Sequence, residues 1–232
     1  MESIQTKIRL KKKKKMINII NHVFSMDETT INFSGDKNDT YLKVIENSFT
    51  SAISGKSNLS DEVKKMKGLS GRKFRVMMNH LIKNFEDPKY LEIGSWLGSS
   101  ACSVCFNNRV NITCIDNWSQ NFSTNLDSKE IFKSNLKKFL NENISLQLIE
   151  KDFRKVNFKN INNVNIYFYD GPHHYQDHYD AIKLVLPALT KKFILIIDDW
   201  NWDQVRKGTL DAIYNEKLKI ISKLEIKTTT DT

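Results

Sequence analysis

Residues 169–180, with the sequence YDGPHHYQDHYD, hold three of the five histidines of the chain and three aspartates. This density of titratable side chains is typical of a site that moves protons. Histidine changes its charge near neutral pH, so His173 or His174 is a candidate general base, and Asp170 beside them is a further candidate catalytic group. The sequence leaves open which of the two histidines accepts the proton.

A zinc site is an alternative use of these histidines. His174 and His178 are four residues apart on an expected helix, a spacing that can present two ligands on one face. The chain has no HExxH motif, and its only other histidines are His22 and His80. The general-base interpretation is therefore favoured, and His178 is expected to cap a helix or to face solvent.

Five short apolar runs predict the strands that position these residues. The runs are rich in Ile, Val, Tyr and Phe, and each is followed by a segment long enough for a helix. This alternation predicts an α/β fold with a doubly wound, mostly parallel, Rossmann-like sheet flanked by helices. The runs are YLEIG (90–94), VNITCID (110–116), ISLQLIE (144–150), VNIYFYD (164–170) and KFILIIDD (192–199), and the clearest helices are 128–143 and 178–189.

The first strand end carries a glycine turn. Ligands of open α/β sheets bind beyond the carboxyl ends of the strands, so residues there are candidates for binding. In YLEIGSWLGSS, Gly94 allows a tight turn and a close approach of a ligand, while Glu92 is placed to accept hydroxyl hydrogens. Gly98 precedes a helix of small residues, but the spacing differs from GxGxxG, which argues against a NAD site.

Two further acids end or follow strands. Asp116 in CIDNW comes some twenty residues after the glycine turn, where an acidic side chain can bind a ribose diol. Asp152 in EKDF follows the third strand and could meet the edge of an adenine. Helix or turn capping is the alternative role for each of them.

The combination E-x-G-x-x-x-G, then Asp116, then Asp152, resembles the S-adenosylmethionine (SAM) site of class I methyltransferases. YDGPHHY followed by LPALTKKFILIIDDW is similar to the small-molecule O-methyltransferases of the cephalosporin-hydroxylase and macrolide-sugar type. The resemblance covers about residues 67–228. The cofactor-binding residues that it implies are Glu92, Gly94, Ser95, Gly98, Asp116, Asn117, Trp118, Asp152 and Phe153.

The resemblance also implies a divalent metal, held by Asp170, Asp198 and Asp199. Three carboxylates without thiolates suit a hard ion such as Mg²⁺. Such an ion can hold substrate oxygens and ease the deprotonation of a hydroxyl. The alternative is that Asp198 and Asp199 only cap the segment that follows their strand.

The activity implied by the resemblance is methyl transfer from SAM to a hydroxyl of a small molecule or glycan sugar. Nucleic-acid amino-methyltransferases carry N/D-P-P-Y/F where this chain has DGPHH, so no nucleic-acid partner is expected. Two other classes remain open. One is a non-catalytic SAM-binding or scaffold module, and the other is a metal-dependent glycosyltransferase or hydroxylase-like enzyme, which nucleotide-sugar binding would identify.

Composition adds limits on location and partners. The net charge is +9, and Lys7, Arg9 and the run Lys11 to Lys15 supply seven positive charges within nine residues, as a mobile arm or a docking arm would. No apolar run is long enough to span a bilayer. The three cysteines, Cys102, Cys105 and Cys114, indicate a reducing, cytoplasmic setting and are expected to be buried small hydrophobes. A homo-oligomer is compatible with the sequence.

One domain with an N-terminal extension is expected. Residues 1–60 form an N-terminal extension, rich in Lys, Asn, Ser and Thr, with one or two helices and partly disordered. Residues 61–232 form the methyltransferase domain, which opens with a helix starting near Ser60 and running towards residue 85. The last candidate strand, residues 218–228, has no successor before Thr232, so the final strand of the family pattern is expected to be missing.

Overall fold

The central element is a five-stranded parallel sheet, as the sequence predicts. The computed structural model describes residues 29–120 and 127–228. The strand order is β4-β3-β2-β5-β6, so the order reverses between β2 and β5. The strands are β2 (Lys89–Ile93), β3 (Val110–Asp116), β4 (Ile144–Glu150), β5 (Val164–Tyr169) and β6 (Leu189–Ile197).

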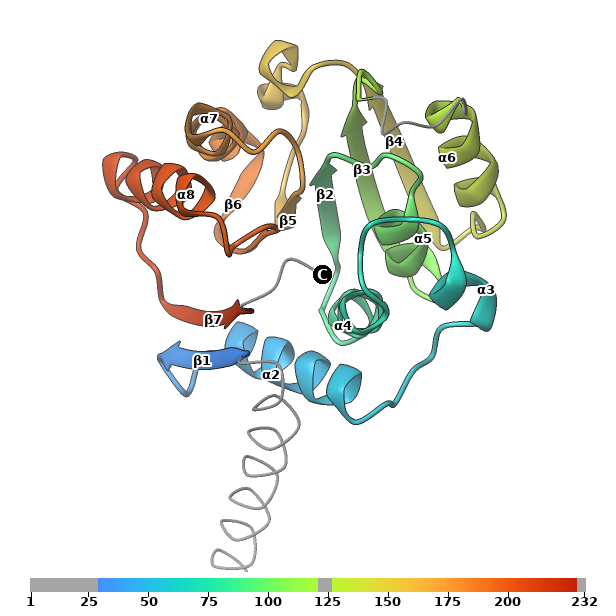
Figure 1. The fold of residues 1–232 in the computed structure, drawn as a ribbon, viewed down its shortest axis with the longest axis horizontal. Coiled ribbons are helices and arrows are strands. Elements are labelled where there is room, and N and C mark those ends of the chain that lie inside the picture. Colours follow the sequence, from blue (N-terminus) through green and yellow to red (C-terminus); the bar gives the residue numbers. More distant parts are fainter. Residues whose placement is uncertain (1–28, 121–126, 229–232) are drawn as a thin grey trace, which may run out of the picture.

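Helices cover both faces of this sheet (Figure 1), which confirms the Rossmann-like fold class. Alternate residues of β2 show how the sequence separates the faces. Tyr90 joins the apolar cluster that includes residues of α4, α5 and α6, whereas Leu91 and Ile93 join the cluster on the side of α7 and α8. The helices are α4 (Arg72–Lys83), α5 (Ser99–Cys105), α6 (Ser128–Lys137), α7 (Tyr175–Val185) and α8 (Asp203–Asn215).

The helix expected to run from Ser60 towards residue 85 is two helices. Ser60 does cap a start, accepting a hydrogen bond from the Val63 main-chain N–H at 3.3 Å, but α3 (Asp61–Lys65) ends after five residues. Gly68 and Gly71 lie in the break before α4. The buried guanidinium of Arg75 donates to main-chain oxygens of this segment, including that of Met66 at 2.7 Å, so a polar contact replaces helix continuation.

The segment before residue 60 contains a strand that the sequence did not predict. β1 (Thr30–Gly35) pairs antiparallel with β7 (Ser222–Lys227) in a separate two-stranded sheet, and α2 (Thr40–Ile53) packs against α4. The expected last strand therefore lies outside the central sheet. The basic run and His22 lie outside the described residues, and the division at residue 60 stays a prediction.

Two other expectations can be compared with the structure. All three cysteines are buried and free, with thiol pKa values raised by burial, so they fit the role of small hydrophobic residues. Within residues 29–120 and 127–228, the helices are all too short or too polar to cross a membrane.

Candidate functional site

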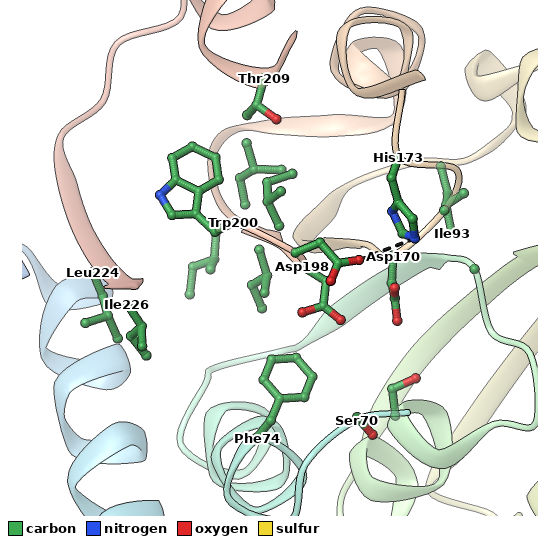
Figure 2. Close-up of a pocket in the computed structure, with 18 of the residues that line it drawn as sticks. Ser70, Phe74, Ile93, Asp170, His173, Asp198, Trp200, Thr209, Leu224 and Ile226 are labelled. Atoms are coloured by element: carbon green, nitrogen blue, oxygen red, sulfur yellow. Dashed lines mark ion pairs between the residues drawn. The ribbon is translucent and has the colours of Figure 1, made fainter. Parts of the chain in front are cut away.

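A cavity of about 1420 Å³ opens at the carboxyl ends of the strands, where the strand order reverses. Polar residues of its wall come from the segments after all five strands, β2 to β6, the position where open α/β sheets bind ligands. Of the predicted site residues, the wall includes Gly94, Ser95, Asp116, Asn117, Trp118, Asp152, Phe153, Asp170, His173, His174, Asp198 and Asp199. It extends along β6 to apolar side chains of α4 and β7, including Phe74, Leu224 and Ile226 (Figure 2).

Gly94 turns the chain sharply after β2, with φ of +91°. A Cβ atom at this position would overlap the main-chain oxygen of Asp170, which follows the adjacent strand β5. The sequence predicted that Gly94 makes room for a ligand. The structure shows that the obstacle is the backbone of the protein itself, so Gly94 first permits β2 and β5 to end side by side.

Asp116 holds this turn from the end of β3. Its Oδ2 accepts hydrogen bonds from the main-chain N–H groups of Ser95 and Trp96, both at 2.8 Å, and its Oδ1 accepts from Trp118 at 2.7 Å. A half-buried carboxylate that accepts three such hydrogen bonds fixes the loop strongly. The capping alternative is thus realised, and a bond from Asp116 to a ribose stays a prediction.

Asn117 and Trp118 continue the same loop. The Asn117 side chain accepts the main-chain N–H of Ser119 at 3.0 Å, while the Trp118 indole donates to the main-chain oxygen of Trp96 at 2.9 Å. The Trp118 ring also packs on Phe132 of α6, with ring centroids 5.3 Å apart. Trp118 therefore joins the two loops that form one wall of the cavity.

Glu92 lies beneath the turn and does not line the cavity. Its side chain is fully buried, and its Oε2 accepts a hydrogen bond from the Tyr90 hydroxyl at 2.8 Å. Its Oε1 has no partner among the described residues, and burial raises the pKa of Glu92. The expected acceptance of ligand hydroxyl hydrogens has no support in this position.

Ser95 and Gly98 frame the start of α5. Ser95 is buried, and its hydroxyl has no partner within the described part of the chain. Gly98 has φ of +84° at the N-cap, where a Cβ would press on the Phe132 ring at 2.9 Å. Ser95 lines the cavity, whereas Gly98 shapes the turn from behind it.

Asp152 and Phe153 form the far wall, after β4. Asp152 caps the short helix η1 (Phe153–Lys155) by accepting the Arg154 main-chain N–H at 3.0 Å. The Phe153 ring is buried edge-on against Tyr169, with ring centroids 5.8 Å apart. Both residues line the same cavity as the turn after β2.

The acidic and histidine residues that follow β5 and β6 line the same cavity. Asp170, His173 and Asp198 point into the same cavity (Figure 2), and His173 Nε2 lies 3.3 Å from Asp199 Oδ2. Removal from water and the nearby charges of Asp198 and Asp199 raise the pKa of Asp170 well above its ordinary value. Burial, followed by the charge of Asp199, also raises the pKa of Asp198.

The two candidate bases differ in their surroundings. His173 is half-buried, pairs with Asp199 and meets the Trp202 ring edge-on, with ring centroids 5.1 Å apart. His174 is exposed and is the N-cap residue of α7. An acidic partner orients an imidazole, so the geometry distinguishes His173 as the more suitable base.

The metal prediction does not gain support from the arrangement of these acids. Carboxylate oxygens are the donors that Mg²⁺ prefers. In the part of the chain that the structure describes, however, no three His, Cys, Asp or Glu side chains are grouped closely enough to hold one ion. Asp199 is instead paired with His173. The residues as placed do not fit a metal, and no step below depends on one.

The sequence missed several residues of the site. Ser70, in the break between α3 and α4, lines the cavity, and its hydroxyl lies 2.9 Å from that of Ser99 on α5. Arg154 also lines the cavity, and its guanidinium pairs with Asp177 of α7. Neither belongs to a recognisable motif. Only the proximity of Asp177 to the two histidines was a signal in the sequence.

Comparison with known proteins agrees with this geometry. Residues 91–200, a little under half of the chain, match the model of a family described as a methyltransferase domain. This match supports SAM-dependent methyl transfer as the chemistry of the matched region. A search of curated proteins found no match.

Solved structures resemble this chain at low sequence identity. A precorrin 8W decarboxylase of Methanobacterium thermoautotrophicum is 12% identical over 70% of this chain and 88% of its own, with a TM-score of 0.50. An SAH-bound methyltransferase of Podospora anserina is 13% identical over 94% and 96%, with a TM-score of 0.46. A precorrin-6y C5,15-methyltransferase of Geobacter metallireducens is 14% identical over 68% and 79%, with a TM-score of 0.49. The likeness to the decarboxylase concerns the fold alone, and no conclusion is drawn from the two structures with TM-scores below 0.5.

Proposed function

We propose that the protein transfers the methyl group of SAM to a hydroxyl of a small molecule or sugar. The observation that carries this proposal is the pairing of His173 with Asp199 in the wall of a cavity that the glycine turn after β2 also lines. The match of residues 91–200 to a methyltransferase domain gives independent support. A cytoplasmic location, independence from nucleic acids and a homo-oligomeric state are further expectations of this proposal.

The cofactor is proposed to lie between the turn after β2 and the segment after β4. Main-chain groups near Gly94 and Ser95 would contact its amino-acid end, Asp116 and Asn117 its ribose, and Asp152 and Phe153 its adenine. Bound SAM supplies the electrophilic methyl group. The protein therefore has to align the acceptor oxygen with that group and remove a proton.

His173 is proposed to take the hydroxyl proton. Its Nε2 faces Asp199 at 3.3 Å, so the imidazolium formed by proton uptake would be stabilised by an adjacent carboxylate. Asp170 and Asp198 are proposed to bind the acceptor hydroxyl and keep it beside His173. The raised pKa of Asp170 allows that side chain to donate as well as accept a hydrogen bond.

The proposal is tested by measuring transfer of a labelled methyl group from SAM to a panel of phenols, catechols and sugars. His173→Ala should lower kcat by about 10²–10⁴-fold, the usual contribution of a general base. His174→Ala is the matched control, because the imidazole of His174 is next to His173 in the sequence but is exposed. This variant should retain most of the turnover. Equal losses in both variants would reject His173 as the base, and absence of transfer to every acceptor would reject the activity.

A further inference from the structure

Arg154 connects the segment Asp152–Phe153 of the cavity wall to helix α7 through its guanidinium. Its Nη1 lies 3.3 Å from Asp152 Oδ1, and its Cζ lies 4.6 Å from the centre of the Phe153 ring. Its Nη2 donates to Oδ1 of Asp177, in the first turn of α7. A planar guanidinium can hold two carboxylates and a ring in one fixed arrangement, which a lysine cannot.

Asp177 is a buried charge with two structural bonds. Its side chain is only 8% exposed, and its second oxygen accepts the main-chain N–H of His174 at 3.1 Å. Asp177 thus fixes the chain one residue after His173. Because an uncompensated buried carboxylate is costly, this bond depends on Arg154 for its counter-charge.

These contacts form a continuous connection between two sites that are distant in the sequence. One end is the segment Asp152–Phe153 after β4, and the other is the loop that carries His173 after β5. The segments η1 and α7 also contact one another directly. A shift of η1 would therefore be transmitted through Arg154 and Asp177 to the main chain beside His173.

We propose that Arg154 and Asp177 are a positioning pair, which sets the loop of His173 relative to the segment Asp152–Phe153. The inference rests on the proposed function, in which that segment binds the adenine and His173 accepts the proton. Neither residue of the pair touches the reacting atoms. Their role is to keep two subsites at a fixed separation, since a misplacement of about 1 Å is enough to cost about 10²-fold in rate.

A purely stabilising role makes a different prediction. If the pair only holds η1 against α7, its loss should lower the melting temperature and leave the environment of His173 and the affinity for SAM unchanged in the folded protein. If the pair positions the loop, both properties should change while the protein remains folded. The distinguishing readouts are therefore the ring signal of His173 and the SAM dissociation constant.

The experiment compares Arg154→Gln with the wild-type protein by NMR, using histidine labelled in the imidazole ring. The His173 signal is assigned by its loss in His173→Ala. In Arg154→Gln we expect this signal to shift and broaden, while the signal of His80, on α4, stays in place. Calorimetry should show SAM binding weakened by about tenfold, which corresponds to about 1.4 kcal/mol.

Two further variants make the test specific. Lys138→Gln is the control, because the ion pair between Lys138 and Glu62 does not line the cavity. This variant should change neither the His173 signal nor the SAM affinity. Arg154→Lys keeps the positive charge beside Asp177 but loses the planar guanidinium with its several fixed N–H donors. This variant should therefore fold even where Arg154→Gln does not. It should still disturb the His173 signal.

An unchanged His173 signal and unchanged SAM affinity in folded Arg154→Gln and Arg154→Lys would overturn the proposal. The NMR readout needs no cofactor. Failure of the wild-type protein to bind SAM would therefore reject the proposed function, whereas the signal of His173 would still decide whether the pair positions its loop.

Discussion

At the scale of single residues, Gly94 is a position where the backbone permits no side chain. Its φ of +91° is unfavourable for any other residue, and a Cβ would overlap the main-chain oxygen of Asp170. We expect Gly94→Ala to lower the free energy of unfolding by more than the roughly 1–3 kcal/mol of backbone strain alone. Urea denaturation followed by circular dichroism measures this change.

Gly55→Ala provides the matched control for Gly94→Ala. Gly55 also has a positive φ, +75°, but a Cβ there would meet no atom within 4 Å. The control should therefore show the strain without the overlap. If both substitutions lower the free energy of unfolding equally, the close approach of the chain after β5 is not the reason that position 94 requires glycine.

His178 should make stability depend on pH. The expectation that His178 caps a helix or faces solvent was wrong, because its side chain is buried within α7. Burial, with a smaller effect from His173, lowers its pKa from 6.5 to about 4. The unfolded chain therefore takes up this proton at a higher pH than the folded protein. The contribution of the neutral His178 side chain to the free energy of unfolding is fully present above pH 6.5. It is lost as the pH falls from about 6.5 towards about 4.

This dependence is measured as the difference in unfolding free energy between wild-type protein and His178→Gln at a series of pH values. The difference should change by at most about 1.4 kcal/mol per pH unit within that window. Below about pH 4 it should level off. A difference that does not vary with pH would show that the imidazole is protonated equally in both states.

At the scale of elements, the sequence predicted the strands better than the helices. All five apolar runs are strands of the sheet, because Ile, Val, Tyr and Phe in short runs suit a sheet buried on both faces. The helix from Ser60 was wrong because its apolar spacing continues across Gly68 and Gly71, whereas Arg75 bonds to the carbonyls of the break. Long-range contacts of this kind leave no periodic signal.

Asp170, Asp198 and Asp199, at the carboxyl ends of β5 and β6, all line the cavity. Among the described residues, however, no three acidic or other ligand side chains are close enough together to bind one metal ion. We therefore expect Mg²⁺ to leave the melting temperature of the cofactor-free protein unchanged, because an ion stabilises a folded protein only by binding it preferentially. Differential scanning fluorimetry with Mg²⁺ and with EDTA checks this. A rise with Mg²⁺ that Asp170→Asn removes would contradict the expectation and support the magnesium prediction.

At the scale of the whole molecule, the strand order decides where the site lies. β2 and β5 are neighbours although β3 and β4 lie between them in the sequence, so the glycine turn and the histidine loop line one cavity. The sequence predicted that strand ends would carry the site residues. It did not predict that β1 pairs with β7, because pairing between distant strands depends on the packing of the complete fold.

The same limit explains which site residues could be predicted. Asp116, Asp170 and His173 follow recognisable strands, so their place at the cavity could be inferred from position alone. Glu92 does not line the cavity, because the alternation of β2 places its side chain on the same face as Tyr90, so its contact with a ligand stays a prediction. Arg154 was missed because its partner Asp177 is 23 residues away in the sequence.

The most direct test of the account is isothermal titration calorimetry of the folded protein with SAM. We expect one molecule of SAM to bind per chain, and Asp116→Ala to weaken the affinity, because Ser95 and Trp96 lose the carboxylate that holds their turn. NAD should not bind. Absence of SAM binding to wild-type protein whose fold is verified by circular dichroism would contradict the central claim that this cavity is a SAM site.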